Sequence, residues 1–529
     1  MNPTPVPFRT FFTRLAAPPW HRRVTLSALA LLALAGLVAV LYLTAVAPWG
    51  YSDSAAYLAE ARNLAAGHGF VLQEPGGGFA FYTWHPPLYP LFLSLPLALG
   101  ADALQAARWL NTLLFALSIF LAGGATYRFT RSFWLAGSAA GLTLASLDPL
   151  TAFSGIMSEG MFILWTFLSL FLLALAFQSP RPANRLILAG LAGSLAFLTR
   201  YIGVSVLAAG ALSVLILTPG RLRARMRSLL LYLLPAAGLA LLWVLPVFLA
   251  THSLGSRSLA ALDTLPDKIR AYLPAFRDVL GTWLPFLNRG NRILPPDLKL
   301  VLAAVLLPLL AWSAARAQRR RGQPLNREGL PGWLLVLGIF CLAYAAVHLG
   351  TYLFLAAQPD VNGRLLLPLY FGGVLLAAGA ADWISRVLPK RWPGALLFTA
   401  LALLTVWYFH TPLKQYQFEM HHYGQGYTSK RWLDNPVFAE LSTLDPATPL
   451  YSNSPALVLF YTQRFPLELP PDAAGTGYDL NLPAGTTLAI FTNAGLGGPT
   501  PADINALAGA EERYLILFEN NEGGLFRIP

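Results

Sequence analysis

Charged side chains are scarce in this sequence. Asp, Glu, Lys and Arg make up 12% of its 529 residues, whereas soluble domains carry about 25%. Hydrophobic residues reach 56%, and the mean hydropathy is +0.53. This balance excludes an ordinary soluble protein and indicates an integral membrane protein.

Cysteine is almost absent, because Cys341 is the only one in the chain. No intrachain disulfide can form, so the fold cannot depend on oxidation. Cys341 lies inside an apolar run, where a small side chain of this kind fills space in a core.

Several familiar functional signatures are also missing. The sequence has no Ser-His-Asp spacing, no Walker loop and no HExxH motif. The glycine run 76–78 lacks the lysine and the helix of a phosphate loop. The net charge of +12 does not indicate a nucleic-acid partner, because the basic residues form short clusters and no stripe with stacking aromatics.

Apolar runs of about 20 residues are long enough to cross a membrane. Basic clusters between these runs follow the positive-inside rule, which places the clusters and the N-terminus in the cytoplasm. The pattern predicts a mainly α-helical, multi-pass membrane protein with about 11 transmembrane helices, the first of them uncleaved. The predicted spans are 24–47, 103–125, 133–147, 157–177, two short spans within 186–217, 228–250, 298–315, 333–355, 365–381 and 395–410.

The stretch 186–217 needs a separate argument, because Arg200 lies at its middle. A single helix would place this arginine at the centre of the bilayer, at a cost of about 2.5–3.5 kcal/mol on insertion scales. Two short spans that meet at Arg200 avoid that cost and return the next arginines to the cytoplasm. We therefore expect a helical hairpin here.

The chain divides into two predicted parts. Residues 1–411 form the transmembrane domain, with outer loops at about 48–102 and 251–296. The segment 87–100 is too short for a span and is expected to be interfacial or re-entrant. The tail, 412–529, has Asn-Pro, Ser-Pro and Thr-Pro pairs typical of helix starts, with β-type runs between them. It predicts a small extracytoplasmic α/β domain.

Ionisable residues that interrupt the apolar pattern all fall on the predicted outer side. At membrane depth such residues are costly and indicate function by default. Structural alternatives remain open: Asp53 or Glu159 could cap a helix, Arg200 and Arg364 could extend to lipid headgroups, and His85 could be structural. The outer group consists of Asp53, Glu60, Arg62, His85, Asp148, Glu159, Arg200 and Arg364.

Short motifs accompany these residues in a definite order. They are Asp53 after the first span, Gly67-His68-Gly69-Phe70, His85-Pro86-Pro87-Leu88-Tyr89-Pro90, Ser158-Glu159, Leu198-Thr199-Arg200 and Gly363-Arg364-Leu365-Leu366-Leu367-Pro368. Together they resemble the GT-C superfamily of membrane glycosyltransferases. The nearest branch is the bacterial group related to aminoarabinose transferases and protein O-mannosyltransferases, and the similarity covers nearly the whole chain.

This resemblance implies a glycosyltransferase of the bacterial plasma membrane whose active site faces away from the cytoplasm. Its donor would be a sugar on a polyprenyl phosphate, and its acceptor a lipid, a glycan or a protein. Inversion at the anomeric carbon is expected. The resemblance requires no cofactor and is compatible with a divalent metal.

The same resemblance implies roles for individual residues. Asp53 matches the catalytic carboxylate, and Glu159, or less well Asp148, matches a second acidic position, so the resemblance implies Asp53 and Glu159 as the catalytic pair. Members of the family often have an acidic pair there, whereas this chain has Ser158-Glu159. The remaining implied roles are phosphate or donor binding by Arg200, Arg364 and Arg62, and substrate or metal contacts by His85, Tyr57 and Asp148.

Physical chemistry is consistent with this assignment. A desolvated carboxylate is expected to have a raised pKa, which would make Asp53 a better base. Arginine stays charged and binds phosphate through two N–H groups. A secondary transporter or flippase of a lipid-linked or anionic substrate is the competing hypothesis, and a non-catalytic membrane scaffold is a third.

Overall fold

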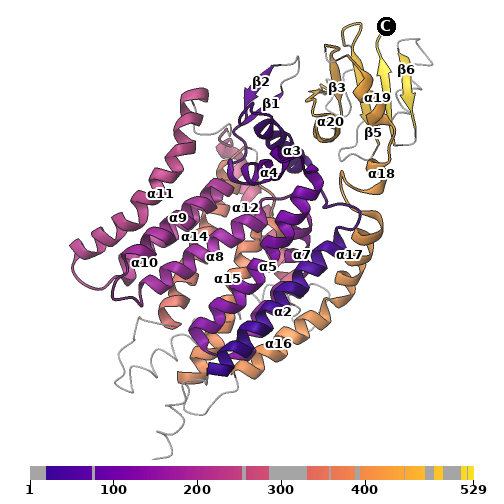
Figure 1. Cartoon of the computed structure of the whole chain (residues 1–529). Coiled ribbons are helices and arrows are strands. Elements are labelled where there is room, and N and C mark those ends of the chain that lie inside the picture. Colours follow the sequence, from indigo (N-terminus) through magenta and orange to yellow (C-terminus); the bar gives the residue numbers. More distant parts are fainter. Residues whose placement is uncertain are drawn as a thin grey trace, which may run out of the picture.

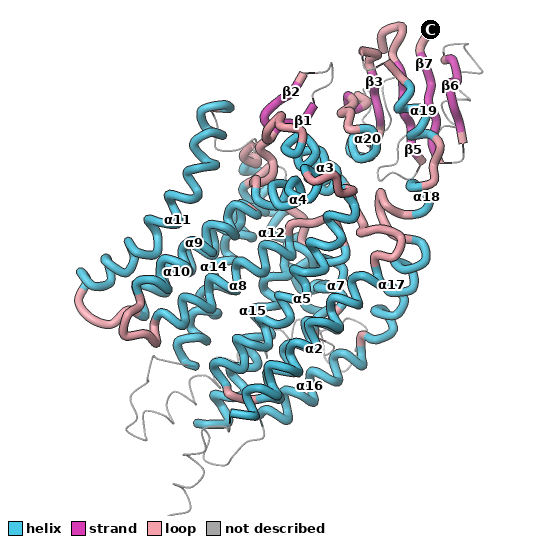
Figure 2. Tube along the Cα trace, in the orientation of Figure 1, coloured by secondary structure: helices cyan, strands magenta, loops and turns pink. Residues whose placement is uncertain are grey.

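The structure is a computed structural model in which a long helical bundle carries a small sheet region beyond one end (Figure 1). Helices dominate the bundle, and the strands gather at that same end (Figure 2). The described residues are 19–73, 78–252, 258–284, 330–356, 359–387, 394–445, 447–470, 482–492, 514–520 and 522–529.

Within these ranges six helices are long and apolar enough to cross a membrane. Helices α16 and α17, bent by 51° at their junction, would make a seventh span if counted together. The six are α2 (Pro19–Leu43), α5 (Ala103–Thr130), α8 (Glu159–Ala176), α11 (Leu222–Thr251), α14 (Leu330–Phe354) and α15 (Gly363–Val387). Shorter or bent apolar helices are α4 (Leu88–Ala98), α6 (Phe133–Ala145), α9 (Ala183–Thr199), α10 (Val204–Leu217), α16 (Gly394–Tyr408) and α17 (His410–Tyr423).

The structure therefore confirms a mainly helical, multi-pass membrane protein. Each predicted span except one coincides with an apolar helix. The exception, 298–315, lies outside the described residues. The count of about 11 spans stays a prediction. The segment 87–100 forms the short helix α4, which packs against α5 and α9.

The predicted hairpin at Arg200 is present. Helix α9 ends at Thr199, Arg200 is extended with φ −150° and ψ 132°, and a 3-10 turn, η1 (Tyr201–Gly203), leads into α10. Gly190 of α9 and Gly210 of α10 both pack directly against Tyr232 of α11. In one straight helix these glycines would lie about 30 Å apart, so α9 and α10 must fold back on each other.

Three further helices and a β-hairpin complete the helical part of the chain. Helix α3 (Ser52–Ala65) follows α2 and packs against α4 and the hairpin. The hairpin pairs β1 (Val71–Gln73) with β2 (Phe79–Phe81) in antiparallel register. Helix α7 (Leu147–Ser154) precedes α8, and η2 (Leu262–Thr264) leads into α12 (Leu265–Trp283), which packs against α14 and α15.

The C-terminal region contains a five-stranded sheet with the order β4-β3-β5-β7-β6. Strands β4, β3 and β5 are parallel, whereas β7 is antiparallel to β5 and β6. This mixed sheet agrees with the α/β character expected for the tail, and the expected boundary after residue 411 falls in the first turn of α17. Its elements are α18 (Lys430–Leu433), α19 (Val437–Thr443), β3 (Leu450–Ser452), α20 (Pro455–Thr462), β4 (Leu467–Glu468), β5 (Thr487–Phe491), β6 (Leu515–Glu519) and β7 (Gly523–Arg527).

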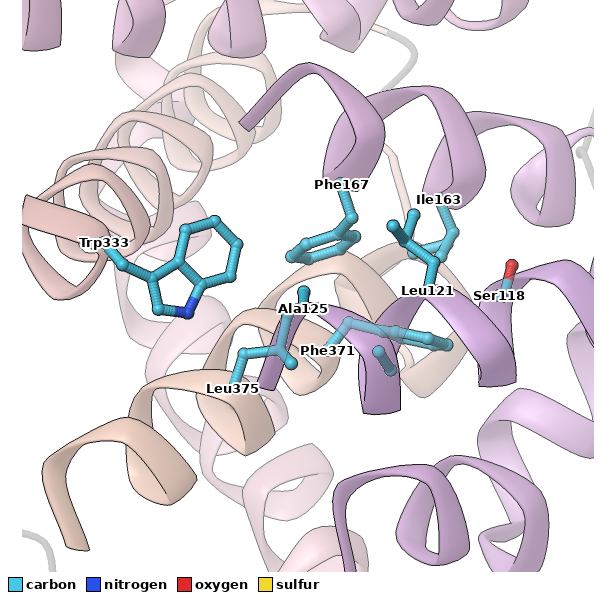
Figure 3. A pocket seen from close by; sticks show the side chains of 9 residues that line it. Ser118, Leu121, Ala125, Ile163, Phe167, Trp333, Phe371 and Leu375 are labelled. Atoms are coloured by element: carbon cyan, nitrogen blue, oxygen red, sulfur yellow. The ribbon is translucent and has the colours of Figure 1, made fainter. Parts of the chain in front are cut away.

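A small apolar cavity lies between α5, α8, α14 and α15 (Figure 3). Aromatic rings from three of these helices, Phe167, Trp333 and Phe371, surround it (Figure 3). Apart from Ser118, the lining is aliphatic or aromatic, so this cavity offers no charged group for chemistry. Its α8 residues, Ile163 and Phe167, lie one and two turns beyond the start of that helix.

Helix α9 packs so closely on α11 that a substitution at Gly190 should change the stability of the protein. A Cβ at Gly190 would overlap the carbonyl oxygen of Tyr232, which is backbone and cannot rotate away. Gly190→Ala should lower the free energy of unfolding by about 1–3 kcal/mol through overpacking. Gly141→Ala in α6 is the matched control, because nothing lies within 4 Å of its Cβ position. Thermal unfolding in detergent measures both, and equal stabilities would contradict the packing argument.

Candidate active site

Two short backbone segments lie side by side just before the helices that carry the acidic residues. Trp49 and Gly155 form a parallel β-bridge, in which Trp49 N–H donates to Ser154 (3.1 Å) and Ile156 N–H donates to Trp49 (2.8 Å). Asp53 follows Trp49 by four residues, and Glu159 follows Gly155 by four. The bridge therefore holds the two chain segments so that Asp53 and Glu159 follow it at equivalent positions.

Both carboxylates occupy the first turn of a helix, α3 for Asp53 and α8 for Glu159. The positive end of the helix dipole favours a negative charge at this position. Gly155 is required at the bridge, because any side chain there would overlap the indole ring of Trp49. The indole N–H of Trp49 also donates to the carbonyl of Thr151 (2.8 Å).

Glu159 lies between two guanidinium groups. Its Oε1 is 2.8 Å from Nη1 of Arg200 and 3.3 Å from Nε of Arg364. The side chain is 4% exposed, and Oε2 has no hydrogen-bond partner among the described residues. A buried carboxylate is tolerated only when opposite charges compensate it, and here two arginines do so.

Asp53 shares one of these arginines but is more accessible. Its Oδ2 lies 3.3 Å from Nη1 of Arg364 and its Oδ1 lies 3.7 Å from Nε2 of His85, with 32% of the side chain exposed. Burial alone would raise the pKa of Asp53, but contact with His85 and the charges of His85, Arg364 and Arg200 outweigh it. The pKa of Asp53 therefore lies well below its ordinary value.

This direction corrects one expectation from the sequence. Desolvation was expected to raise the pKa of Asp53 and so make it a stronger base. The sequence could not show that guanidinium and imidazole groups from α15 and the 82–87 loop converge on the same carboxylate. Nearby positive charge stabilises the ionised form more than partial burial destabilises it.

His85 contacts Asp53 through one edge of its ring only. Its Nδ1 is buried and has no hydrogen-bond partner in the described part of the chain. The ring lies 4.5 Å from that of Tyr57 and 5.7 Å from that of Tyr82, measured between centroids. His85 is thus fixed by aromatic packing, with Nε2 directed at the carboxylate.

Tyr57 and Ser158 connect α3, which carries Asp53, to the start of α8, which carries Glu159. The Tyr57 hydroxyl and Ser158 Oγ are 2.9 Å apart, and Arg200 donates to the same Oγ at 3.1 Å. Tyr57 is fully buried between the rings of His85 and Tyr89, and burial raises the pKa of its phenol. These contacts fix Arg200 and His85 relative to α3.

Two residues expected in the site lie outside this cluster. Arg62 donates to the backbone carbonyl of Phe460 in α20 (3.4 Å), so it faces the C-terminal region. Asp148 in α7 accepts a hydrogen bond from the indole of Trp283 (2.5 Å) and packs against Gly363, next to Arg364. Burial raises the pKa of Asp148. Asp148 thus packs beside the start of α15, where Arg364 lies, and its hydrogen bond goes to Trp283.

Sequence reasoning missed several contributors. Arg364 Nη1 lies 3.1 Å from the sulfur of Met157. Tyr201 donates from its hydroxyl to the carbonyl of Thr83 (2.9 Å) and accepts from the indole of Trp243 (3.2 Å), which ties the His85 loop to α11. Only the position of Tyr201 beside Arg200 hinted at this role, because the contacts are set by the tertiary fold.

The acidic residues of the cluster have cationic partners in the structure. No group of three or more His, Cys, Asp or Glu side chains suited to a metal occurs in the described ranges. The two carboxylates that a metal would need already face guanidinium groups.

The site thus combines an accessible carboxylate with two arginines held by a buried carboxylate. Arginines of this kind bind phosphate oxygens through charge-assisted hydrogen bonds. An ionised carboxylate beside them can accept a proton from a hydroxyl group. This geometry can therefore bind a phosphate group and accept a proton from a hydroxyl group at the same place.

The helical bundle defines a multi-pass membrane protein. Among solved structures, it is similar to ArnT from Cupriavidus metallidurans. The ArnT structure bound to undecaprenyl phosphate aligns with a TM-score of 0.51 and 14% identity, over 97% of this chain and 98% of ArnT. The apo ArnT structure gives a TM-score of 0.53 and 16% identity, over 94% and 97% of the two chains.

The archaeal oligosaccharyltransferase AglB from Archaeoglobus fulgidus aligns with a TM-score of 0.48 and 15% identity, over 89% of this chain and 69% of AglB. No protein-family model matches the sequence, and no curated protein matches it. The similarity to ArnT concerns the fold.

Glu60 provides an internal comparison for the buried charge of Glu159. It lies seven residues after Asp53 on α3, is buried, and its Oε2 has no partner among the residues described. Burial raises the pKa of Glu60 well above its ordinary value. Burial thus favours the neutral form of Glu60, whereas Glu159 faces two guanidinium groups.

Replacing each buried glutamate by glutamine should have opposite results. Glu159→Gln leaves Arg200 without its carboxylate partner and Arg364 with Asp53 alone, and should reduce the free energy of unfolding by about 3–5 kcal/mol. Burial raises the pKa of Glu60 in the folded protein. The contribution of Glu60 to the free energy of unfolding therefore falls as the pH rises from the ordinary pKa of glutamate toward this raised pKa. Glu60→Gln should therefore be at least as stable as wild type at neutral pH. Thermal unfolding at several pH values checks both, and equal losses would contradict this.

Proposed function

We propose that this chain is a glycosyltransferase that moves a sugar from a polyprenyl-phosphate donor to a hydroxyl acceptor at the extracytoplasmic face of the bacterial plasma membrane. The acceptor would be a lipid, a glycan or a protein. The observation that carries the proposal is Arg364, whose guanidinium contacts both Asp53 and Glu159 at the outer end of the bundle. The GT-C fold, shared with an ArnT structure that binds undecaprenyl phosphate, supports it.

Asp53 is the base in this proposal. It takes the proton from the acceptor hydroxyl as that oxygen attacks the anomeric carbon from the face opposite the phosphate. The bond from the anomeric carbon to the phosphate oxygen breaks, and the polyprenyl phosphate leaves with the bonding electrons. One displacement from the opposite face inverts the anomeric configuration.

Arg364 and Arg200 stabilise the phosphate as its negative charge grows. Such preorganised positive groups act on the charge that develops in the transition state. Phosphate leaves without protonation, so the mechanism needs no general acid. Glu159 keeps the two guanidiniums in place and acts as a positioning residue in this scheme.

Donor binding also solves the problem of the low pKa of Asp53. In the structure Arg364 contacts Asp53 directly. A donor phosphate that engages Arg364 would replace this contact, and loss of a neighbouring positive charge raises the pKa of a carboxylate. Asp53 would become a stronger base only after the donor has bound.

Basic side chains at the opposite end of the bundle support the proposed orientation. Arg128 donates to Gln178 (3.1 Å) near the ends of α5 and α8, and Arg386 donates to the carbonyl of Thr130 (2.8 Å) near the end of α15. Helices α8 and α15 start at the site and finish here. The positive-inside rule places this arginine-rich end in the cytoplasm and the site outside.

The base assignment predicts that Asp53→Asn abolishes transfer, with a loss of at least about 10²–10⁴-fold in kcat. Binding of the lipid donor should persist, because both arginines remain. Asp102→Asn is the matched control, since Asp102 caps α5 through Gln105 N–H and asparagine caps equally well. The measurement is transfer from labelled polyprenyl-phosphate sugar in proteoliposomes. Full activity of Asp53→Asn would refute the assignment, and flux of the lipid without transfer would favour a transporter or flippase.

Arg364 makes a second prediction, on donor dependence. Arg364→Ala should raise the KM for the donor about 10–100-fold, which corresponds to the loss of charge-assisted hydrogen bonds. Arg364→Lys should recover part of this affinity by keeping the charge. Arg62→Ala should leave the donor KM unchanged, because Arg62 faces Phe460 and not the cluster. An unchanged donor KM in both Arg364 variants would mean that this arginine only extends toward lipid headgroups.

A further inference from the structure

We propose that a loop of the C-terminal region, residues 424–429, positions the carboxylate of Asp53 for proton transfer. Gly426 and Thr428 are the positioning residues. This inference rests on the proposed function and assigns the C-terminal region a part in catalysis. The loop touches the chain just before α3 and therefore determines where that helix begins.

The contact is made by backbone pairing. Gly426 forms a parallel bridge with Gly50, and Tyr427 N–H donates to the carbonyl of Gly50 at 2.8 Å. The Thr428 hydroxyl donates to the carbonyl of Pro48 at 2.8 Å, and its side chain is fully buried. The segment 48–50 therefore lies between two partners, 154–156 on one side and 426–428 on the other.

Gly426 fits this place for two reasons. Its φ is +63°, a left-handed conformation that side chains rarely adopt. A Cβ at this position would also overlap the carbonyl oxygen of Gly50 and approach the ring of Tyr51 to 3.1 Å. Any larger residue must push the loop away from the segment that leads to Asp53.

The loop itself is held firmly against α3. Tyr461 of α20 donates from its hydroxyl to the carbonyl of Tyr427 (2.5 Å). Tyr427 packs edge-on against Phe460 and Tyr51. Arg62 of α3 donates to the carbonyl of Phe460, so the loop, α20 and α3 behave as one packed unit.

Asp53 is sensitive to such a constraint because its own contacts are long. The oxygen–nitrogen distances are 3.3 Å to Arg364 and 3.7 Å to His85, and a third of the side chain is exposed. One hydrogen bond slightly longer than usual and one ion pair beyond hydrogen-bond range leave the carboxylate some freedom. The start of α3 must therefore supply the precision, and an error of about 1 Å in a catalytic group costs roughly 10²-fold in rate.

The first test replaces Gly426 in the full-length protein. Gly426→Ala should lower kcat about 100-fold while the KM for polyprenyl-phosphate sugar stays unchanged, because Arg200 and Arg364 are held by Glu159, Ser158 and Met157. Gly485→Ala is the matched control: Gly485 lies in the same region with φ +81° but has nothing within 4 Å of its Cβ position. It carries a similar backbone strain and should keep wild-type kcat.

The second test uses the Thr428 hydroxyl and avoids backbone strain. Thr428→Val removes the bond to Pro48 and should lower kcat about tenfold, a smaller effect than that of a misplaced backbone. Thr428→Ser keeps a hydroxyl and should restore kcat.

The acid limb of the pH profile for kcat/KM should move to higher pH in Gly426→Ala and Thr428→Val. The reason is that a displaced Asp53 separates from His85, Arg364 and Arg200, which lower its pKa.

The outcomes separate this inference from the proposed function. If wild type does not transfer sugar, or Asp53→Asn is fully active, the proposed function fails. If wild type transfers and Asp53→Asn does not, but Gly426→Ala and Thr428→Val keep wild-type kcat and pH profile, only the positioning inference is overturned. A loss of kcat equal in Gly426→Ala and Gly485→Ala would also overturn it, because general strain would then explain the result.

Discussion

Backbone pairing between 48–50 and 154–156 is the constraint on which the site depends. The bridge joins Trp49 to Gly155, and the acidic residues follow each partner by the same number of positions. Helices α3 and α8 therefore start together, and their first turns present Asp53 and Glu159 to the same space. Gly155 allows the bridge by leaving room for the Trp49 ring.

The arginines explain why two carboxylates can share this space. Glu159 is buried against Arg200 and Arg364, and without them its desolvation would be unfavourable. Arg364 reaches Asp53 as well and, together with His85 and Arg200, lowers the pKa of this carboxylate. In the proposed reaction the same guanidinium binds the donor phosphate, so donor binding would raise the pKa of Asp53 and make it a stronger base.

Much of the fold could be predicted from the sequence. The length of each apolar run and the position of each basic cluster are set directly by the thickness and the two faces of the bilayer. The break at Arg200 was predictable from the cost of a central charge, and the helical hairpin confirms it. The α/β character of the tail followed from proline-capped helix starts and β-type runs. Arg62 was less predictable, since its direction on α3 depends on α20, which lies almost 400 residues further along the chain.

Sequence alone determined that this protein lies in the membrane, and that Asp53, His85, Glu159, Arg200 and Arg364 share one side of it. Periodicity and charge carry that information because each span must satisfy the bilayer locally. Only the tertiary structure decided which of these residues touch and how their charges combine. It brought Arg364 from α15 onto Asp53, left Asp148 with Trp283, and pressed the loop of Gly426 against Gly50. Such contacts join segments more than a hundred residues apart, and their electrostatics depend on distances of a few ångströms that no local pattern encodes.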